Sequence, residues 1–207
     1  TDPIYDSFAK EIITQPSHEK ARAYGYSLAN SVIDAFHAGE FHPSPEPKLN
    51  VSALEVELGI ENFMLSLGTL LGIIDSDPKF NFKPPFVRYL SEVAFIELGD
   101  ATTTGIPGEL YPEIAVGGIE NPQGADYTMA AQEIPHLRSQ LPGKLNLMVN
   151  LANDAIGYII PKSEWDNEAP WIYDETDETY GEVVSLGPNT GPIIHQNIIK
   201  LIEDSKN

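Results

Sequence analysis

The chain has 207 residues, of which 31 are Asp or Glu and 12 are Lys or Arg, so its formal net charge at pH 7 is −19. Its apolar fraction of 42% is that of a globular protein and excludes a disordered acidic tail. The negative charge argues against nucleic acid as a partner, and no apolar run is long enough to predict a transmembrane helix. The sequence has no cysteine, which excludes disulfides, thiolate metal ligands and cysteine nucleophiles.

The N-terminal part of the sequence predicts two helices and a connector. Residues 2–14 are expected to form a short amphipathic helix. A second helix is expected over 18–38, because apolar residues recur there at helical spacing, with Ser17 as N-cap and Gly39 at the C-cap. Residues 40–48 carry three prolines at alternate positions and predict an extended connector.

The middle of the chain predicts strands around one ambiguous segment. Residues 49–58 have a β-like pattern, whereas the continuous apolar run over 63–74 fits either a helix or a strand. Residues 75–85 are expected to form a loop. The strand expected over 87–98 ends in four consecutive apolar residues, 93–96, a pattern typical of a strand buried on both faces.

The last third of the chain contains the clearest strand and the clearest helix. Over 145–151, leucine or valine at every odd position alternates with Asn146, Met148 and Asn150, the period of two that is typical of a strand. After Pro192 a helix is expected, with one apolar face made by Ile194, Ile198, Leu201 and Ile202. Because helices and strands are intermixed without an internal repeat, the predicted fold class is α/β or α+β, a mixed sheet flanked by helices.

Self-contained catalytic signatures do not occur in the sequence. It has no G-x-S-x-G, P-loop or H-E-x-x-H motif, and its five histidines do not pair at a metal-binding spacing on an expected helix. The acidic run at 174–179 lacks the glycine and the terminal glutamate of an EF-hand loop. A solvated loop is therefore the better interpretation of that run.

Two short segments place polar side chains where an expected strand ends. In Pro107-Gly108-Glu109, the proline stops a strand and the glycine permits a sharp turn, which presents the Glu109 carboxylate at the carboxyl edge of the sheet. In the segment from Asn153 to Tyr158, a polar turn follows the alternating strand, and Gly157 lets the tyrosine project. Taken singly, each segment is more simply interpreted as a structural turn.

In their order and spacing, these segments resemble the neutral/alkaline, non-lysosomal ceramidase family. Members carry a strand that ends in Pro-Gly-Glu, then a strand with an Asn-x-x-x-x-Tyr stretch, then a segment with Tyr and Glu before a Gly-Pro. The third element corresponds here to Tyr180-Gly181-Glu182, followed by Gly187-Pro188. The helix over 19–38 and the stretch 61–72 are also similar to that family, so the resemblance covers residues 17–203.

The resemblance implies a zinc site shared between two parts of one catalytic domain. It implies Glu109 and Tyr158 as zinc ligands, completed by two histidines of an N-terminal half that has no counterpart in these residues. It also implies Tyr180 as the catalytic residue that stabilises the oxyanion, with Tyr173 as a competing candidate. Zinc in such a site lowers the pKa of bound water and polarises a carbonyl. The implied reaction is hydrolysis of the N-acyl bond of ceramide or a related lipid amide.

The resemblance also has implications for the domain organisation, the location and the partners of the chain. Residues 1–207 are expected to be a single domain, the C-terminal half of a zinc-hydrolase domain in a secreted or extracellular protein. Its expected partners are the N-terminal part of the same domain and a lipid amide. Because two oxygen ligands seldom hold zinc against water, the chain alone is expected to be inactive. The alternative is a non-catalytic acidic domain, with a binding or structural role, that keeps the fold without the metal.

Overall fold

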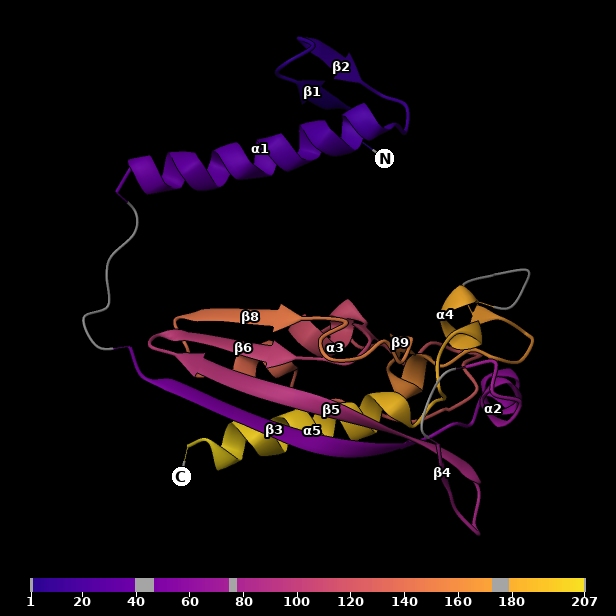
Figure 1. Cartoon of the computed structure of the whole chain (residues 1–207). Coiled ribbons are helices and arrows are strands. Elements are labelled where there is room, and N and C mark those ends of the chain that lie inside the picture. The colour runs from indigo at the N-terminus through magenta and orange to yellow at the C-terminus, as the bar shows by residue number, and fades with distance from the viewer. Residues whose placement is uncertain (1, 40–46, 75–77, 173–178, 207) are drawn as a thin grey trace. The chain divides into compact units, whose positions relative to one another are not determined.

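The computed structural model describes residues 2–39, 47–74, 78–172 and 179–206. The contacts between residues divide the chain into two compact units, Thr1–Pro45 and Glu46–Asn207. The connector expected over 40–48 lies almost entirely outside the described residues. Figure 1 shows the elements of both units in chain order.

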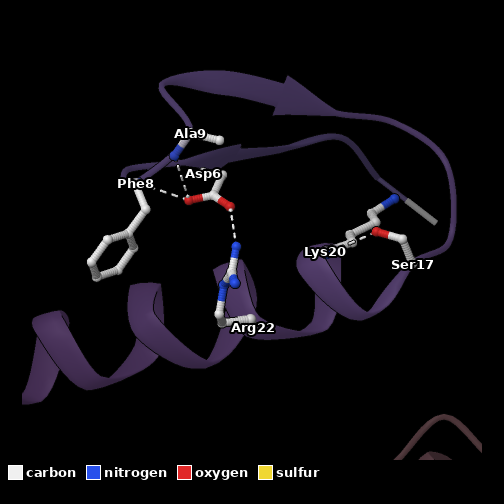
Figure 2. Close-up of polar contacts among 6 residues, drawn as sticks. All are labelled: Asp6, Phe8, Ala9, Ser17, Lys20 and Arg22. Carbon is white, nitrogen blue, oxygen red and sulfur yellow. Dashed lines mark hydrogen bonds and ion pairs between the residues drawn. The ribbon is translucent and has the colours of Figure 1, made fainter.

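The first unit begins with a β-hairpin, so the helix expected over residues 2–14 is wrong. Strands β1 (Ile4–Asp6) and β2 (Glu11–Ile13) pair antiparallel. The turn between them is closed by the Asp6 carboxylate, whose Oδ1 accepts hydrogen bonds from the backbone N–H of Phe8 at 2.8 Å and of Ala9 at 3.2 Å (Figure 2). Such a side-chain bond to nearby backbone offers the chain an alternative to helix.

Helix α1 (His18–His37) follows as predicted. Ser17 is its N-cap, and the Ser17 hydroxyl accepts from the Lys20 backbone N–H at 3.1 Å (Figure 2). The helix ends before Gly39, which has a positive φ of 73° that glycine adopts without strain. Arg22 donates to Asp6 Oδ2 at 3.3 Å and so ties the helix to the hairpin.

A five-stranded mixed sheet forms the centre of the second unit, as the sequence predicts. Its strands are β3 (Leu49–Gly59), β4 (Lys79–Phe80), β5 (Val87–Leu98), β6 (Ala101–Gly105) and β8 (Leu145–Val149). The order is β3-β5-β6-β8, with β4 paired to β5. All pairs are antiparallel except β6 and β8, which run parallel.

The helices of the second unit are mostly short. They are α2 (Phe63–Leu70), α3 (Pro112–Val116), α4 (Tyr180–Val183) and α5 (Thr190–Asp204), with 3₁₀ turns η1 (Leu137–Gln140) and η2 (Lys162–Glu164). The ambiguous apolar segment is therefore helical, and Asn62 caps it by accepting from the backbone N–H groups of Met64 and Leu65. No helix among the described residues is long and apolar enough to cross a membrane.

One face of the sheet is covered by α5, which lies along β3 and β5 (Figure 1). The face predicted for this helix is confirmed, since Ile194, Ile198 and Ile202 are at most 1% exposed. They belong to the same core as Val56, Leu58, Val93 and Phe95 of the sheet. Burial of these aliphatic side chains is the main source of stability for this unit.

The opposite face of the sheet is apolar over the half where β6 and β8 pair with it. Register places these exposed or partly buried residues on that half: Leu49, Val51, Ala53, Ala94, Ile96, Leu98, Ala101, Thr103, Leu145, Leu147 and Val149. Further along β3 and β5, the same face carries the charged residues Glu55, Glu57, Arg88 and Glu92. The expectation that segment 93–96 is buried on both faces is thus wrong, because Ala94 and Ile96 are only partly buried. In β8 the leucines at 145 and 147 are 57% and 47% exposed and face outward, whereas Met148 packs against the core. We call the apolar half of this surface the open face.

Candidate functional site

Two short parallel strands bring Glu109 and Tyr158 side by side. Strand β7 (Glu109–Leu110) pairs with β9 (Tyr158–Ile159), and the two residues are direct partners in the register. The Tyr158 hydroxyl donates a hydrogen bond to the Glu109 carboxylate, and this bond, followed by burial, raises the pKa of Tyr158 above its usual value. The two residues predicted to act together are therefore in direct contact.

Glycines in both segments permit the close approach of these strands. A Cβ on Gly108 would lie 2.4 Å from the Gly157 carbonyl oxygen, and that same oxygen accepts from the Glu109 backbone N–H at 2.9 Å. A Cβ on Gly157 would lie 1.8 Å from the Val184 carbonyl oxygen, and its φ is +85°. Only glycine fits at such positions, so the two segments depend on each other sterically.

The polar turn before Tyr158 is held by the neighbouring strand β5. The Asp154 carboxylate accepts from the hydroxyls of Tyr89 at 3.0 Å and Ser91 at 2.8 Å. Asn153 has a positive φ of 69°, which asparagine tolerates well, and its amide donates to Glu92 at 2.8 Å. Asn153 and Asp154 thus shape the loop that delivers Tyr158.

Tyr180 comes to the same place from a third segment. It begins α4 and is 72% exposed, and its ring meets that of Tyr158 edge to face, with centroids 5.9 Å apart. The three residues predicted as site residues are therefore neighbours in space. The competing candidate, Tyr173, lies outside the described residues, as does nearly all of the acidic run.

Helix α4 is anchored to the apolar helix α2 by one side chain. The Asn62 amide donates to the carbonyl oxygens of Val183 at 2.9 Å and Ser185 at 3.2 Å. Ser185 in turn donates its hydroxyl to the Tyr158 carbonyl oxygen at 2.7 Å. These bonds fix the segment after Tyr180 against the Tyr158 strand. Asn62 was recognised in the sequence only as part of a similar stretch.

A third aromatic residue, Tyr111, lies next to Tyr158 on the other side. The ring centroids are 6.0 Å apart in an edge-to-face arrangement. Burial, and then the nearby charge of Glu182, raise the pKa of Tyr111 to about 12. Sequence reasoning missed this residue, although the period of two in a strand places Tyr111 on the same side as Glu109.

Glu182 faces the interior rather than the exposed aromatic residues. It is 3% exposed, accepts from the Asp166 backbone N–H at 3.2 Å and also accepts from the Thr179 hydroxyl. Burial raises the pKa of Glu182 to about 7, against the lowering effect of backbone hydrogen bonds. The side chain therefore changes charge near neutral pH.

A hollow of the second unit adjoins this region but is not lined by Glu109 or Tyr158. It has a volume of about 540 Å³ and is lined by described residues of α2, α4 and the segments 126–127 and 165–168. Glu182 and Asn62 contribute to its wall. Glu109 and Tyr158 instead lie together outside it.

The donor atoms at Glu109 and Tyr158 suit a divalent metal in part. A carboxylate and a phenol oxygen are already within hydrogen-bonding reach of each other, and both atom types can bind Zn²⁺. Two oxygens make half of a tetrahedral set. Among the described residues, no group of three or more His, Cys, Asp or Glu side chains is arranged to hold a metal.

Comparison with protein-family models gives no match to this chain, and comparison with curated proteins gives none either.

Proposed function

We propose that this chain supplies part of the active site of a zinc-dependent amide hydrolase of the neutral ceramidase type. The observation that supports this most is the meeting of Glu109, Tyr158 and Tyr180. They come from three segments far apart in the sequence, and yet one hydrogen bond and one ring contact join them. The proposed substrate is ceramide or a related lipid amide, and the proposed setting is a secreted or extracellular protein.

In this proposal Glu109 and Tyr158 provide two of the metal ligands. When bound, zinc would supply a Lewis acid for the amide carbonyl and a water with a pKa near neutrality. Glu109 holds the Tyr158 hydroxyl in position through their hydrogen bond, so the two oxygens lie together where they would hold the metal. Tyr180 is exposed beside Tyr158, so its hydroxyl is available to donate to the oxygen of the scissile amide.

The remaining ligands would come from an N-terminal part of the same catalytic domain, packed on the open face. That face is apolar, and an exposed patch of this kind marks an interaction surface. It also leads to the site, because β6 and β8 continue directly into the turns that precede Glu109 and Tyr158. A segment covering the open face would thus stand close to both residues.

The proposal is tested on the native protein that contains this sequence. Its zinc content is measured by elemental mass spectrometry, and hydrolysis is followed with a fluorescent N-acyl sphingosine. Glu109→Gln and Tyr158→Phe are expected to lose zinc and to reduce kcat at least ~100-fold, whereas Tyr180→Phe is expected to keep zinc and lose activity. Asp204→Asn, an exposed change on α5, is the matched control.

A different result would favour the second candidate, an acidic binding or structural domain without the metal. Native protein that holds no zinc and hydrolyses no lipid amide would overturn the enzyme proposal. Full activity of the purified 207-residue chain, with no other polypeptide present, would overturn the proposal that the site is shared.

A further inference from the structure

We propose that Tyr111 is a positioning residue of this site, which holds the Tyr158 ring and the start of α4 in their mutual arrangement. The importance of that arrangement for catalysis rests on the proposed function. The arrangement itself, and the part that Tyr111 has in it, can be measured without zinc or substrate.

Tyr111 extends the strand that presents Glu109. Its backbone N–H donates to the Ile159 carbonyl oxygen at 3.0 Å, continuing the ladder between β7 and β9 by one more bond. Alternation along the strand then sends the side chains of Glu109 and Tyr111 to the same side, on which Tyr158 stands. Tyr158 is thus flanked by a carboxylate and a ring that come from one short segment.

The Tyr111 side chain reaches past Tyr158 to the backbone of α4. A Cβ built on Gly181 would lie 2.3 Å from the Tyr111 hydroxyl oxygen and 3.4 Å from its Cζ. The hydroxyl is therefore packed directly on the α-carbon of the residue that follows Tyr180. Gly181 is helical, so the glycine is explained by this contact and not by an unusual φ.

These contacts make a chain of three rings, Tyr111, Tyr158 and Tyr180. Both neighbouring pairs are edge to face, at 6.0 and 5.9 Å. Tyr180 is mostly exposed and Tyr111 is half-buried, so Tyr111 is the end of the chain that the protein interior fixes. Without the Tyr111 side chain, the Tyr158 ring would lose the ring contact that the protein interior holds in place. It would keep the ring contact with Tyr180, which is exposed.

The first test measures geometry in the 207-residue chain by NMR. Nuclear Overhauser contacts between the ring protons of Tyr158 and Tyr180 are compared in wild type, Tyr111→Phe and Tyr111→Leu. We expect the contacts to persist in Tyr111→Phe, which keeps the ring, and to fall at least two-fold in Tyr111→Leu. Tyr127→Phe and Tyr127→Leu, at another half-buried tyrosine, are matched controls and should leave them unchanged. Wild-type contacts in Tyr111→Leu would overturn the proposal.

The second test asks whether the hydroxyl meets Gly181, and it remains informative if Tyr111→Leu fails to fold. Gly181→Ala should lower the urea midpoint of unfolding, because the new methyl group collides with the Tyr111 hydroxyl. The double variant Tyr111→Phe/Gly181→Ala should recover most of that loss, since removing the oxygen removes the collision. Additive effects of the two changes would overturn the contact.

Activity of the native protein gives a third measurement. Tyr111→Leu is expected to lower kcat at least ten-fold with KM changed less than three-fold, and Tyr111→Phe to restore kcat to within three-fold of wild type. If wild type hydrolyses no lipid amide, the proposed function fails and the two tests above still decide the role of Tyr111. An active enzyme with unchanged kcat in Tyr111→Leu would overturn the positioning role alone.

Discussion

The side-chain amide of Asn62 donates a hydrogen bond to the carbonyl oxygen of Val183 at 2.9 Å, across 121 positions of sequence. The same side chain caps α2 through its oxygen. A single residue thus begins one helix and closes the end of another, which is how the Tyr180 segment is joined to the middle of the chain.

Replacing Asn62 is therefore expected to reduce stability by more than the loss of a helix cap alone would. Asn62→Ala should lower the free energy of unfolding by about 2 kcal/mol, from a lost cap and lost bonds to carbonyl oxygens. Asn62→Asp should also be destabilising. The aspartate keeps the cap, but it places an oxygen, which cannot donate, where the amide nitrogen of Asn62 donates to carbonyl oxygens. Urea unfolding measures both. Asn50→Ala, which removes an exposed amide bound to Glu97, should change stability by less than about 0.5 kcal/mol.

Stability is expected to depend on pH through Glu182. The folded pKa of about 7 lies above the ordinary value of 4.5, so the folded state retains the proton more strongly. Protonated Glu182 therefore adds to the free energy of unfolding. This stabilisation is fully present below pH 4.5 and is lost as the pH rises through 7, with a total on the order of 3 kcal/mol.

Glu182→Gln should remove this dependence. Its amide can accept from the Asp166 N–H and donate to the Thr179 hydroxyl, so the fold is preserved. Unfolding free energies measured from pH 4.5 to 8 should show a smaller decline than in wild type. Asp204→Asn, an exposed change on α5, should decline like wild type. A decline in Glu182→Gln equal to that of wild type would contradict the prediction.

Gly157→Ala should be among the most destabilising single changes in the second unit. The methyl group would lie 1.8 Å from a backbone oxygen, and the positive φ adds strain that no side-chain movement relieves. We expect a loss of about 3 kcal/mol or more, measured by thermal unfolding. Gly25→Ala is the opposite control. It lies in α1 with open space around its Cβ, and should be neutral or stabilising by up to about 1 kcal/mol.

The hairpin of the first unit should open in acid. Hydrogen bonding, first from the Phe8 backbone N–H, holds the pKa of Asp6 below its ordinary value of 3.8. The ionised Asp6 carboxylate therefore stabilises the folded hairpin. This stabilisation is present above pH 3.8 and is lost as the pH falls through the pKa of Asp6 in the folded state. The protection factors for amide hydrogen exchange at Phe8 and Ala9, which correct for the intrinsic pH dependence of exchange, should fall in acid and in Asp6→Ala. Asp2→Ala, which keeps the carbonyl that accepts from Tyr24, should leave the exchange rates unchanged.

The long elements of this fold were predictable from the sequence, because period and caps act locally. The helix capped by Ser17, the strand over 87–98 and the buried face of α5 are all confirmed. The hairpin at residues 4–13 was not predicted, since one carboxylate bonding to its own turn overrides a weak helical pattern. The strand expected over 145–151 is confirmed as β8, and its leucines lie on the open face.

The proximity of Glu109 and Tyr158 was predicted from a resemblance and not from periodicity. Their strands are only two residues long, too short to give a pattern of their own. The roles of Asn153 and Gly181 follow from contacts with distant backbone, so they could be found only once the fold was known.

The pairing of β6 with β8 has a consequence for recognising other proteins with the same arrangement. Gly105 and Val149 are the last partners of that ladder, and Glu109 and Tyr158 are partners in the next, so the turns differ in length by a fixed amount. Removing or adding one residue in either turn would place Gly157 or Ile159 opposite Glu109 in place of Tyr158. The contact between the glutamate and the tyrosine should therefore be lost in a related sequence whose two turns differ in length by another number of residues. This holds even if both motifs are preserved.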